Sequence, residues 1–112
     1  MVGFSAGAAL TMATMMRGEE AKPAFIGNIY GGVNAMDIPA DAPPLFVAVA
    51  VDDRLLFTVT RGLFDDWTDA GRPAEMHAYS RGGHGFGMAR LGLPSDGWID
   101  RFGEWLVDQG LA

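Results

Sequence analysis

Apolar residues in this chain occur in short blocks that alternate between two kinds of pattern. Four blocks are brief and continuous, which is typical of strands buried on both faces. These predicted strands end at residue 4 or cover residues 24–30, 45–51 and 75–79. Three longer blocks predict helices at residues 6–17, at 54–70, and from Pro94 to the glycine at position 110. This order predicts an α/β fold of about four mostly parallel strands joined by helical crossovers.

The handedness of the crossovers predicts which helices share a face of the sheet. If the strands lie side by side in chain order, right-handed crossovers place helices 6–17 and 54–70 on the same face. Only the last helix then covers the other face. We expect the whole chain, residues 1–112, to form one domain.

The three helices differ in how their apolar residues are distributed. Helix 6–17 is apolar on all sides, which predicts a buried helix. The other two carry a single stripe, and Ser95 is a plausible N-cap of the last one. The stripe residues are Leu55, Leu56, Val59, Leu63 and Trp67 in the first of these, and Trp98, Ile99, Phe102, Trp105 and Leu106 in the second.

Composition narrows the possible functions. Of the 112 residues, 49% are hydrophobic and 20% are charged, which indicates a packed globule. The formal charge of −6 argues against nucleic-acid and anionic-membrane partners, both of which call for basic patches. No cysteine is present, so disulfides and thiolate metal sites are excluded. The longest apolar run is too short to span a bilayer, and we expect a cytoplasmic protein.

The start of the chain, Gly3-Phe4-Ser5-Ala6-Gly7, has the pattern G-x-S-x-G. This pattern is typical of a serine on a tight strand-to-helix turn, where a base can reach its hydroxyl. Side chains two residues before and after the serine would collide in such a turn, so glycine suits both sites. The free N–H groups of the following helix point to where an oxyanion would form.

Two further loops at the carboxyl ends of the predicted strands carry side chains that complete this chemistry. Asp52 and Asp53 follow one strand, and His84 lies in a glycine-dense loop after the next. A serine nucleophile needs a histidine base, and the histidine needs an acid to fix its tautomer. The residues occur in the order serine, acid, histidine, as in α/β-hydrolases.

Three motifs carry a family resemblance, and they lie at residues 3–7, 43–53 and 79–87. With the closing segment from Gly97 to Leu106, they resemble the C-terminal half of esterases of the α/β-hydrolase superfamily. The resemblance is to acetyl-esterase and acetyl-xylan-esterase-like members, near the dienelactone hydrolases. It implies a truncated, minimal α/β-hydrolase fold and a serine carboxylesterase acting on short-chain acyl esters without a cofactor.

The resemblance also implies roles for individual residues. Ser5 would be the nucleophile, His84 the general base, and the backbone N–H of Ala6 an oxyanion donor. Asp53 would be the acid, counted from a family glycine whose place Ala50 takes here, so Asp52 stays an alternative.

Other residues have both a functional and a structural interpretation. Phe86 and Met88 follow the candidate base and would line a substrate pocket or pack in the core. Tyr30 would border the site or lie in a plain turn. His77 is expected to be structural, and two separated histidines without clustered carboxylates make a metal site improbable.

Complete members of this family have about as much chain again before the serine motif, including a loop with further oxyanion donors. Losing one such donor lowers turnover by a factor of ~10² to 10³. Without that segment, the first strand is a short exposed sheet edge and helix 6–17 lacks neighbours. We therefore expect a homo-oligomer. The alternative to an esterase is a weak or inactive hydrolase fragment that acts as an assembling domain.

Overall fold

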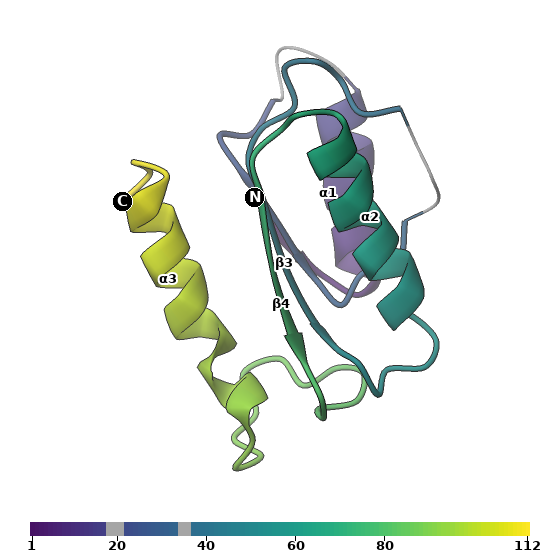
Figure 1. Cartoon of the computed structure of the whole chain (residues 1–112), viewed down its shortest axis with the longest axis vertical. Coiled ribbons are helices and arrows are strands. Elements are labelled where there is room, and N and C mark those ends of the chain that lie inside the picture. The colour runs from purple at the N-terminus through teal and green to yellow at the C-terminus, as the bar shows by residue number, and fades with distance from the viewer. Residues whose placement is uncertain (18–21, 34–36) are drawn as a thin grey trace.

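The sheet has the predicted topology. The computed structural model describes residues 1–17, 22–33 and 37–112, and it shows one four-stranded sheet (Figure 1). The strands are β1 (Val2–Phe4), β2 (Ile26–Ile29), β3 (Leu45–Ala50) and β4 (Ala74–Tyr79). They lie in the order β1-β2-β3-β4, and every neighbouring pair is parallel. The predicted α/β fold of parallel strands is confirmed, and the strands lie in chain order.

Helices cover both faces of the sheet, as the crossover rule predicts. The first two, α1 (Ala6–Met16) and α2 (Phe57–Asp69), lie on one face (Figure 1). A short 3₁₀ turn, η2 (Pro94–Gly97), leads into α3 (Trp98–Asp108), which covers the opposite face (Figure 1). Within the described ranges, no helix has the length and apolarity needed to cross a membrane.

Strand β3 supplies the centre of the core, because all six of its side chains are fully buried. Alternate residues point to opposite faces of a strand, so β3 contributes to two separate clusters. Against α1 and α2 the cluster comprises Met12, Met15, Ile26, Ala42, Leu45, Val47, Leu63 and Trp67. Against α3 it is rich in aromatic rings, namely Tyr30, Phe46, Phe86, Trp98, Phe102 and Trp105.

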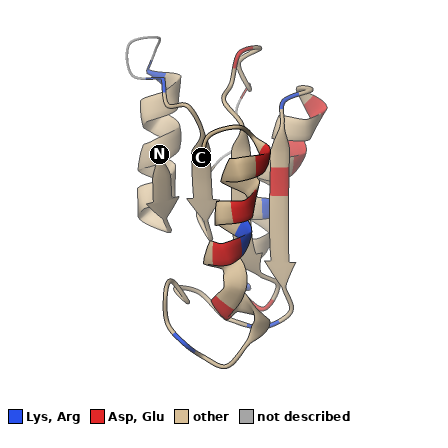
Figure 2. Cartoon of the chain, turned by 90° about the vertical axis from the view of Figure 1, so that its left-hand side faces the viewer, with Lys and Arg blue, Asp and Glu red and all other residues tan. Residues whose placement is uncertain are grey.

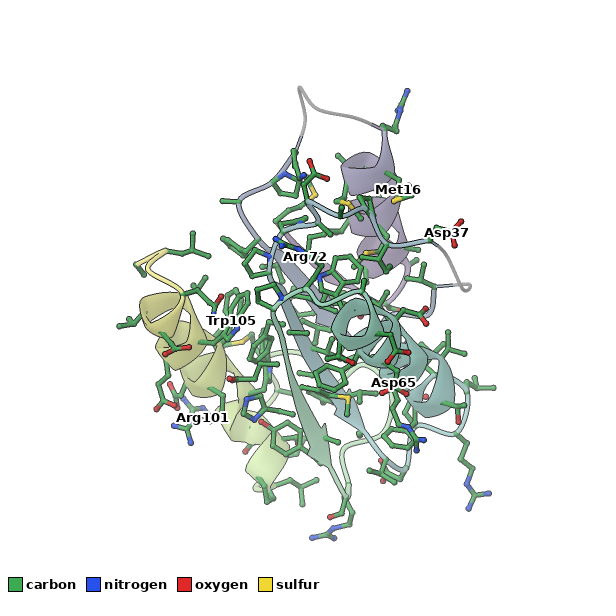
Figure 3. The ribbon with its side chains drawn as sticks, turned by 45° about the horizontal axis from the view of Figure 1, so that its top comes forward. Met16, Asp37, Asp65, Arg72, Arg101 and Trp105 are labelled. Carbon is green, nitrogen blue, oxygen red and sulfur yellow. The ribbon has the colours of Figure 1, made fainter. Side chains whose placement is uncertain are left out.

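Helix α3 separates apolar from charged residues as its stripe predicts. Trp105 points from α3 toward the sheet, whereas Arg101 points away from it (Figure 3). Trp98, Phe102 and Trp105 are buried, and Figure 2 shows that the face turned toward the viewer carries acidic positions. Burial of three large aromatic side chains is the main contribution that holds α3 to the sheet.

The second helix begins later than its sequence pattern predicts. Residues 53–56 form a turn in which the carbonyl of Asp53 accepts the N–H groups of Leu56 and Phe57, at 3.3 and 2.9 Å. Leu55 therefore lies outside α2 and is 84% exposed, and Val59 lies at the exposed flank of the helix. The buried stripe is formed by Thr60, Leu63 and Trp67.

The predicted N-cap role of Ser95 is wrong. Pro94 begins the 3₁₀ turn, so Ser95 lies within the turn, and Leu93 occupies the N-cap position. The hydroxyl oxygen of Ser95 is buried and has no hydrogen-bond partner among the described residues.

Burial of α1 on all sides is also not found in this chain. The helix packs on the sheet through Ala8, Thr11, Met12 and Met15. On its outer side Leu10 is 69% exposed and Met16 is also exposed. A helix on the surface of a sheet buries one side only, so an apolar outer side stays in contact with solvent unless another element covers it.

Candidate active site

Ser5 occupies a strained turn between β1 and α1. Its backbone angles are φ 52° and ψ −120°, a region that residues with a side chain rarely adopt. The N–H of Ser5 donates to the carbonyl of Ile29 at 3.0 Å, which ties the turn to the end of β2. The serine is thus held at the carboxyl edge of the sheet, where β1 ends.

Only one of the two glycines in the motif is required by close packing. A Cβ atom on Gly3 would lie 2.3 Å from the carbonyl oxygen of Gly7 and 2.4 Å from Oγ1 of Thr11. A Cβ atom on Gly7 would meet nothing within 4 Å among the described residues. Among the described residues, the expected collision is therefore present at Gly3 and absent at Gly7.

His84 bridges Ser5 and Asp53. Its Nε2 lies 2.9 Å from Oγ of Ser5, and its Nδ1 lies 2.7 Å from Oδ2 of Asp53. The Asp53 side chain is only 2% exposed and also accepts the N–H of Leu56 through Oδ1 at 3.2 Å, whereas that of His84 is 40% exposed. With the proton of a neutral imidazole on Nδ1, Nε2 is free to accept the serine hydroxyl.

Asp52 and Asp53 have different partners. Asp52 accepts the N–H of Gly83 through Oδ1 at 2.8 Å, so its carboxylate contacts the main chain beside His84 and not the imidazole. Of the two aspartates left open by the sequence, Asp53 is therefore the one that the fold brings to the histidine ring.

The first turn of α1 presents free donors beside Ser5. The helix begins at Ala6, so the N–H of Ala6 has no acceptor within the helix. It follows Ser5 directly, and the partial positive charge of a helix N-terminus favours an anion at this position.

Comparison with known proteins supports the fold assignment. No protein-family model and no curated protein matches the chain. Solved structures do match. An acetyl ester-xyloside bifunctional hydrolase from Caldicellulosiruptor lactoaceticus superposes with a TM-score of 0.83 at 21% identity, covering 98% of this chain and 56% of that one.

Two more solved structures agree. A carboxylesterase from Lactobacillus plantarum WCFS1 gives a TM-score of 0.80 at 17% identity, over 98% of this chain and 58% of its own. An alpha/beta hydrolase from a Medee basin deep-sea metagenome library gives 0.78 at 22% identity, over 94% and 51%. The chain has an α/β-hydrolase fold. It spans about half the length of the solved structures that it matches.

Within this α/β-hydrolase fold, the ring of Tyr30 packs against His84 of the candidate triad. It has φ 41°, and its ring contacts those of His84 and Phe86 edge to face, with centroids 5.0 Å apart in both pairs. Burial raises the pKa of Tyr30, and a hydrogen bond from the backbone of Gly87 opposes this rise. Tyr30 thus supports one side of the imidazole ring.

The other two candidate pocket residues differ in exposure. Phe86 is buried, with its ring against Tyr30 and Tyr79, so it packs beneath the loop of residues 80–88 that carries His84, called here the histidine loop. Met88 is 65% exposed in the same loop. The flexible thioether side chain of Met88, four residues after His84 in the chain, is available for contact with an apolar group, whereas Phe86 is already surrounded.

His77, the other histidine, lies on β4 and pairs with a different acid. Its Nε2 lies 2.8 Å from Oε2 of Glu75, and its ring stacks on Phe46 with centroids 5.4 Å apart. These are the contacts of a structural histidine. In the described part of the chain, no three potential metal ligands of the types His, Cys, Asp or Glu come together.

One contributor near the site, Asn28, was missed in the sequence, and Gly31 was considered only as part of the segment Tyr30-Gly31-Gly32 that would border the site or form a plain turn. Asn28 accepts the N–H of Gly31 at 2.9 Å, and a Cβ on Gly31 would lie 2.1 Å from that of Ala8. Asn28 and Gly31 thus hold the Tyr30 turn against the start of α1. The available signal was an asparagine inside an otherwise apolar strand that ends in a glycine pair.

Proposed function

We propose that this chain carries the acyl-transfer site of a serine esterase that hydrolyses short-chain carboxylic esters. The observation that carries the proposal is the continuous chain of contacts from Ser5 through His84 to Asp53, at 2.9 and 2.7 Å. Both distances lie within the range at which a nucleophile and its base exchange a proton. The proposal needs no cofactor.

The first half of the reaction forms an acyl-enzyme. The Oγ atom of Ser5 attacks the ester carbonyl carbon while Nε2 of His84 takes the hydroxyl proton. The carbonyl oxygen becomes an oxyanion, which the N–H of Ala6 stabilises. The tetrahedral intermediate then collapses, the C–O bond to the alcohol breaks, and His84 returns the proton to the leaving oxygen.

The second half releases the acid. Water attacks the acyl carbon as His84 removes its proton, and the bond to Oγ of Ser5 breaks with return of that proton to Oγ. The carboxylate of Asp53 stabilises the imidazolium that forms in both halves. Its near-complete burial strengthens this interaction, since little water screens it.

The fold and the family resemblance support a short-chain ester as the substrate. Two of the solved structures that match at the level of fold are, by their names, a carboxylesterase and a hydrolase of acetyl esters. Met88 is the exposed apolar side chain that we assign to the acyl group, and Phe86 and Tyr30 support the loop beneath it.

Hydrolysis of p-nitrophenyl acetate and butyrate tests the proposal. Ser5→Ala and His84→Ala should each abolish the activity, because each removes a group that takes part in bond making. His77→Ala is the matched control and should retain it, since His77 pairs with Glu75 on β4. Wild-type rates in the Ser5 or His84 variant would contradict the proposed triad.

A second candidate function is an inactive hydrolase domain that serves in assembly. The exposed apolar outer side of α1, with Leu10 and Met16, favours it, because apolar surface of this kind is usually covered by another chain. A second copy of this chain is the partner that we propose for this surface under either function. Stoichiometric labelling of Ser5 by a fluorophosphonate would exclude the inactive domain, and absence of labelling in folded protein would exclude the esterase.

A further inference from the structure

Two consecutive carboxylates hold two consecutive residues of the histidine loop. Asp53 accepts Nδ1–H of His84, and Asp52 accepts the main-chain N–H of Gly83 at 2.8 Å. We propose that Asp52 is a positioning residue that holds the backbone on which His84 is carried, so that Nε2 of His84 stays within reach of Ser5. Its effect on the reaction rests on the proposed esterase function, whereas its effect on His84 does not.

The histidine loop needs such a tether because its backbone has little conformational preference of its own. Four of its glycines have positive φ: 153° at Gly82, 64° at Gly83, 83° at Gly85 and 45° at Gly87. Glycine reaches these angles without strain, but it also reaches many others. The backbone preferences of the residues around His84 are therefore too weak to fix the position of its imidazole ring.

Other contacts hold the two ends of the loop and the side chain of Phe86, which packs against Tyr30 and Tyr79. At the start, the N–H of Val51 donates to the carbonyl of Tyr79, which joins β3 to the end of β4. At the far end, Nε1 of Trp98 donates to the carbonyl of Gly87 at 2.7 Å. Between them, the hydrogen bond from Gly83 to Asp52 restrains the main chain directly before His84.

The carboxylate of Asp52 is suited to this task. It lies in an exposed turn two residues after β3, and because all six residues of β3 are buried, this turn is attached to the centre of the sheet. Asp53 by itself restrains only the imidazole ring, and the side-chain torsions of His84 would still let the backbone move.

Substitution separates the hydrogen bond from the charge. Asp52→Ala removes the acceptor, while Asp52→Asn keeps a carbonyl oxygen that accepts the N–H of Gly83 but carries no charge. If Asp52 acts by positioning, Asn rescues what Ala loses. Asp65→Ala is the control. Asp65 is an exposed aspartate on α2, and its carboxylate forms a long ion pair with Arg61, at 3.9 Å (Figure 3).

Nuclear magnetic resonance of the full chain tests positioning without any need for activity. In Asp52→Ala we expect the amide signal of Gly83 and the imidazole signals of His84 to shift, with dispersed core signals unchanged. Asp52→Asn and Asp65→Ala should keep the His84 signals at their wild-type positions. Unchanged His84 signals in Asp52→Ala, or a shift in Asp52→Asn equal to that in Asp52→Ala, would overturn the proposal.

The rate of fluorophosphonate labelling at Ser5 then measures the effect on the reaction. Because misplacement by about 1 Å costs up to ~10²-fold, we expect Asp52→Ala to label about tenfold more slowly, with Asp52→Asn within about twofold of wild type. A wild-type rate in Asp52→Ala would overturn the positioning role. Failure of the wild type itself to label would instead contradict the proposed esterase, and the His84 signals would still decide the role of Asp52.

Discussion

The two glycines of the G-x-S-x-G motif should respond to alanine in opposite ways. In Gly3→Ala the new Cβ would lie 2.3 Å from the carbonyl oxygen of Gly7, so strand and helix must separate by about 1 Å to reach ordinary contact. Overpacking of this kind costs about 1–3 kcal/mol. The bond from the Thr11 hydroxyl to Gly7, which lies at the same point, would add about 1 kcal/mol if broken. We expect Gly3→Ala to lower the free energy of unfolding by about 3 kcal/mol in total.

Gly7→Ala is the matched control. Its Cβ meets nothing within 4 Å among the described residues, and alanine is favoured over glycine inside a helix by about 1 kcal/mol. This variant should therefore be slightly more stable than the wild type. Near this chain length 1 kcal/mol corresponds to about 4 °C, so the two melting temperatures should differ by more than about 10 °C.

Urea unfolding followed by tryptophan fluorescence measures both variants. All three tryptophans, Trp67, Trp98 and Trp105, are buried and lie on both sides of the sheet, so their emission reports global unfolding. Equal stability of Gly3→Ala and the wild type would refute the close approach of β1 and α1. A loss of more than about 1 kcal/mol in Gly7→Ala would refute the open space at that site.

Three further predictions concern the acid, a buried hydroxyl and assembly. Asp53→Asn should fold normally but lower ester turnover by about 10³- to 10⁴-fold, because an amide favours the wrong histidine tautomer; a decrease below tenfold would contradict the assigned acid. Burial raises the pKa of Tyr79, whose hydroxyl has no partner among the described residues. Because the unfolded chain ionises Tyr79 first, the free energy of unfolding should fall as the pH rises above about 10. Urea titrations at pH 9 and pH 11 measure this effect. The free energy of unfolding should decrease less between these two pH values in Tyr79→Phe than in the wild type, and an identical decrease would contradict the prediction. Light scattering after size exclusion should show a homo-oligomer that Leu10→Glu dissociates; a wild-type monomer at micromolar concentration would contradict self-association.

Much of the fold follows from local pattern. The continuous apolar run of β3 needs cover on both faces, and the structure buries all six of its residues. The stripe of α3 likewise matches its buried tryptophans and Phe102. Boundaries were less predictable: Leu55 fits the helical period of α2, but the turn that Asp53 makes with Leu56 delays the start of the helix.

The residues of the candidate site are far apart in the sequence, and only part of their arrangement could be predicted from it. The sequence by itself determined that Ser5, the aspartate pair and His84 each follow a predicted strand. In a sheet of parallel strands these carboxyl ends lie at one edge, so the sequence also predicted that the residues would be neighbours. Only the tertiary structure decided which aspartate reaches the imidazole. Neighbouring residues in a turn point in different directions, so Asp53 faces His84 while Asp52 faces the backbone of Gly83. The local motif predicted a collision at both glycines, whereas only the tertiary structure shows that Gly3 lies against α1 and that Gly7 has open space.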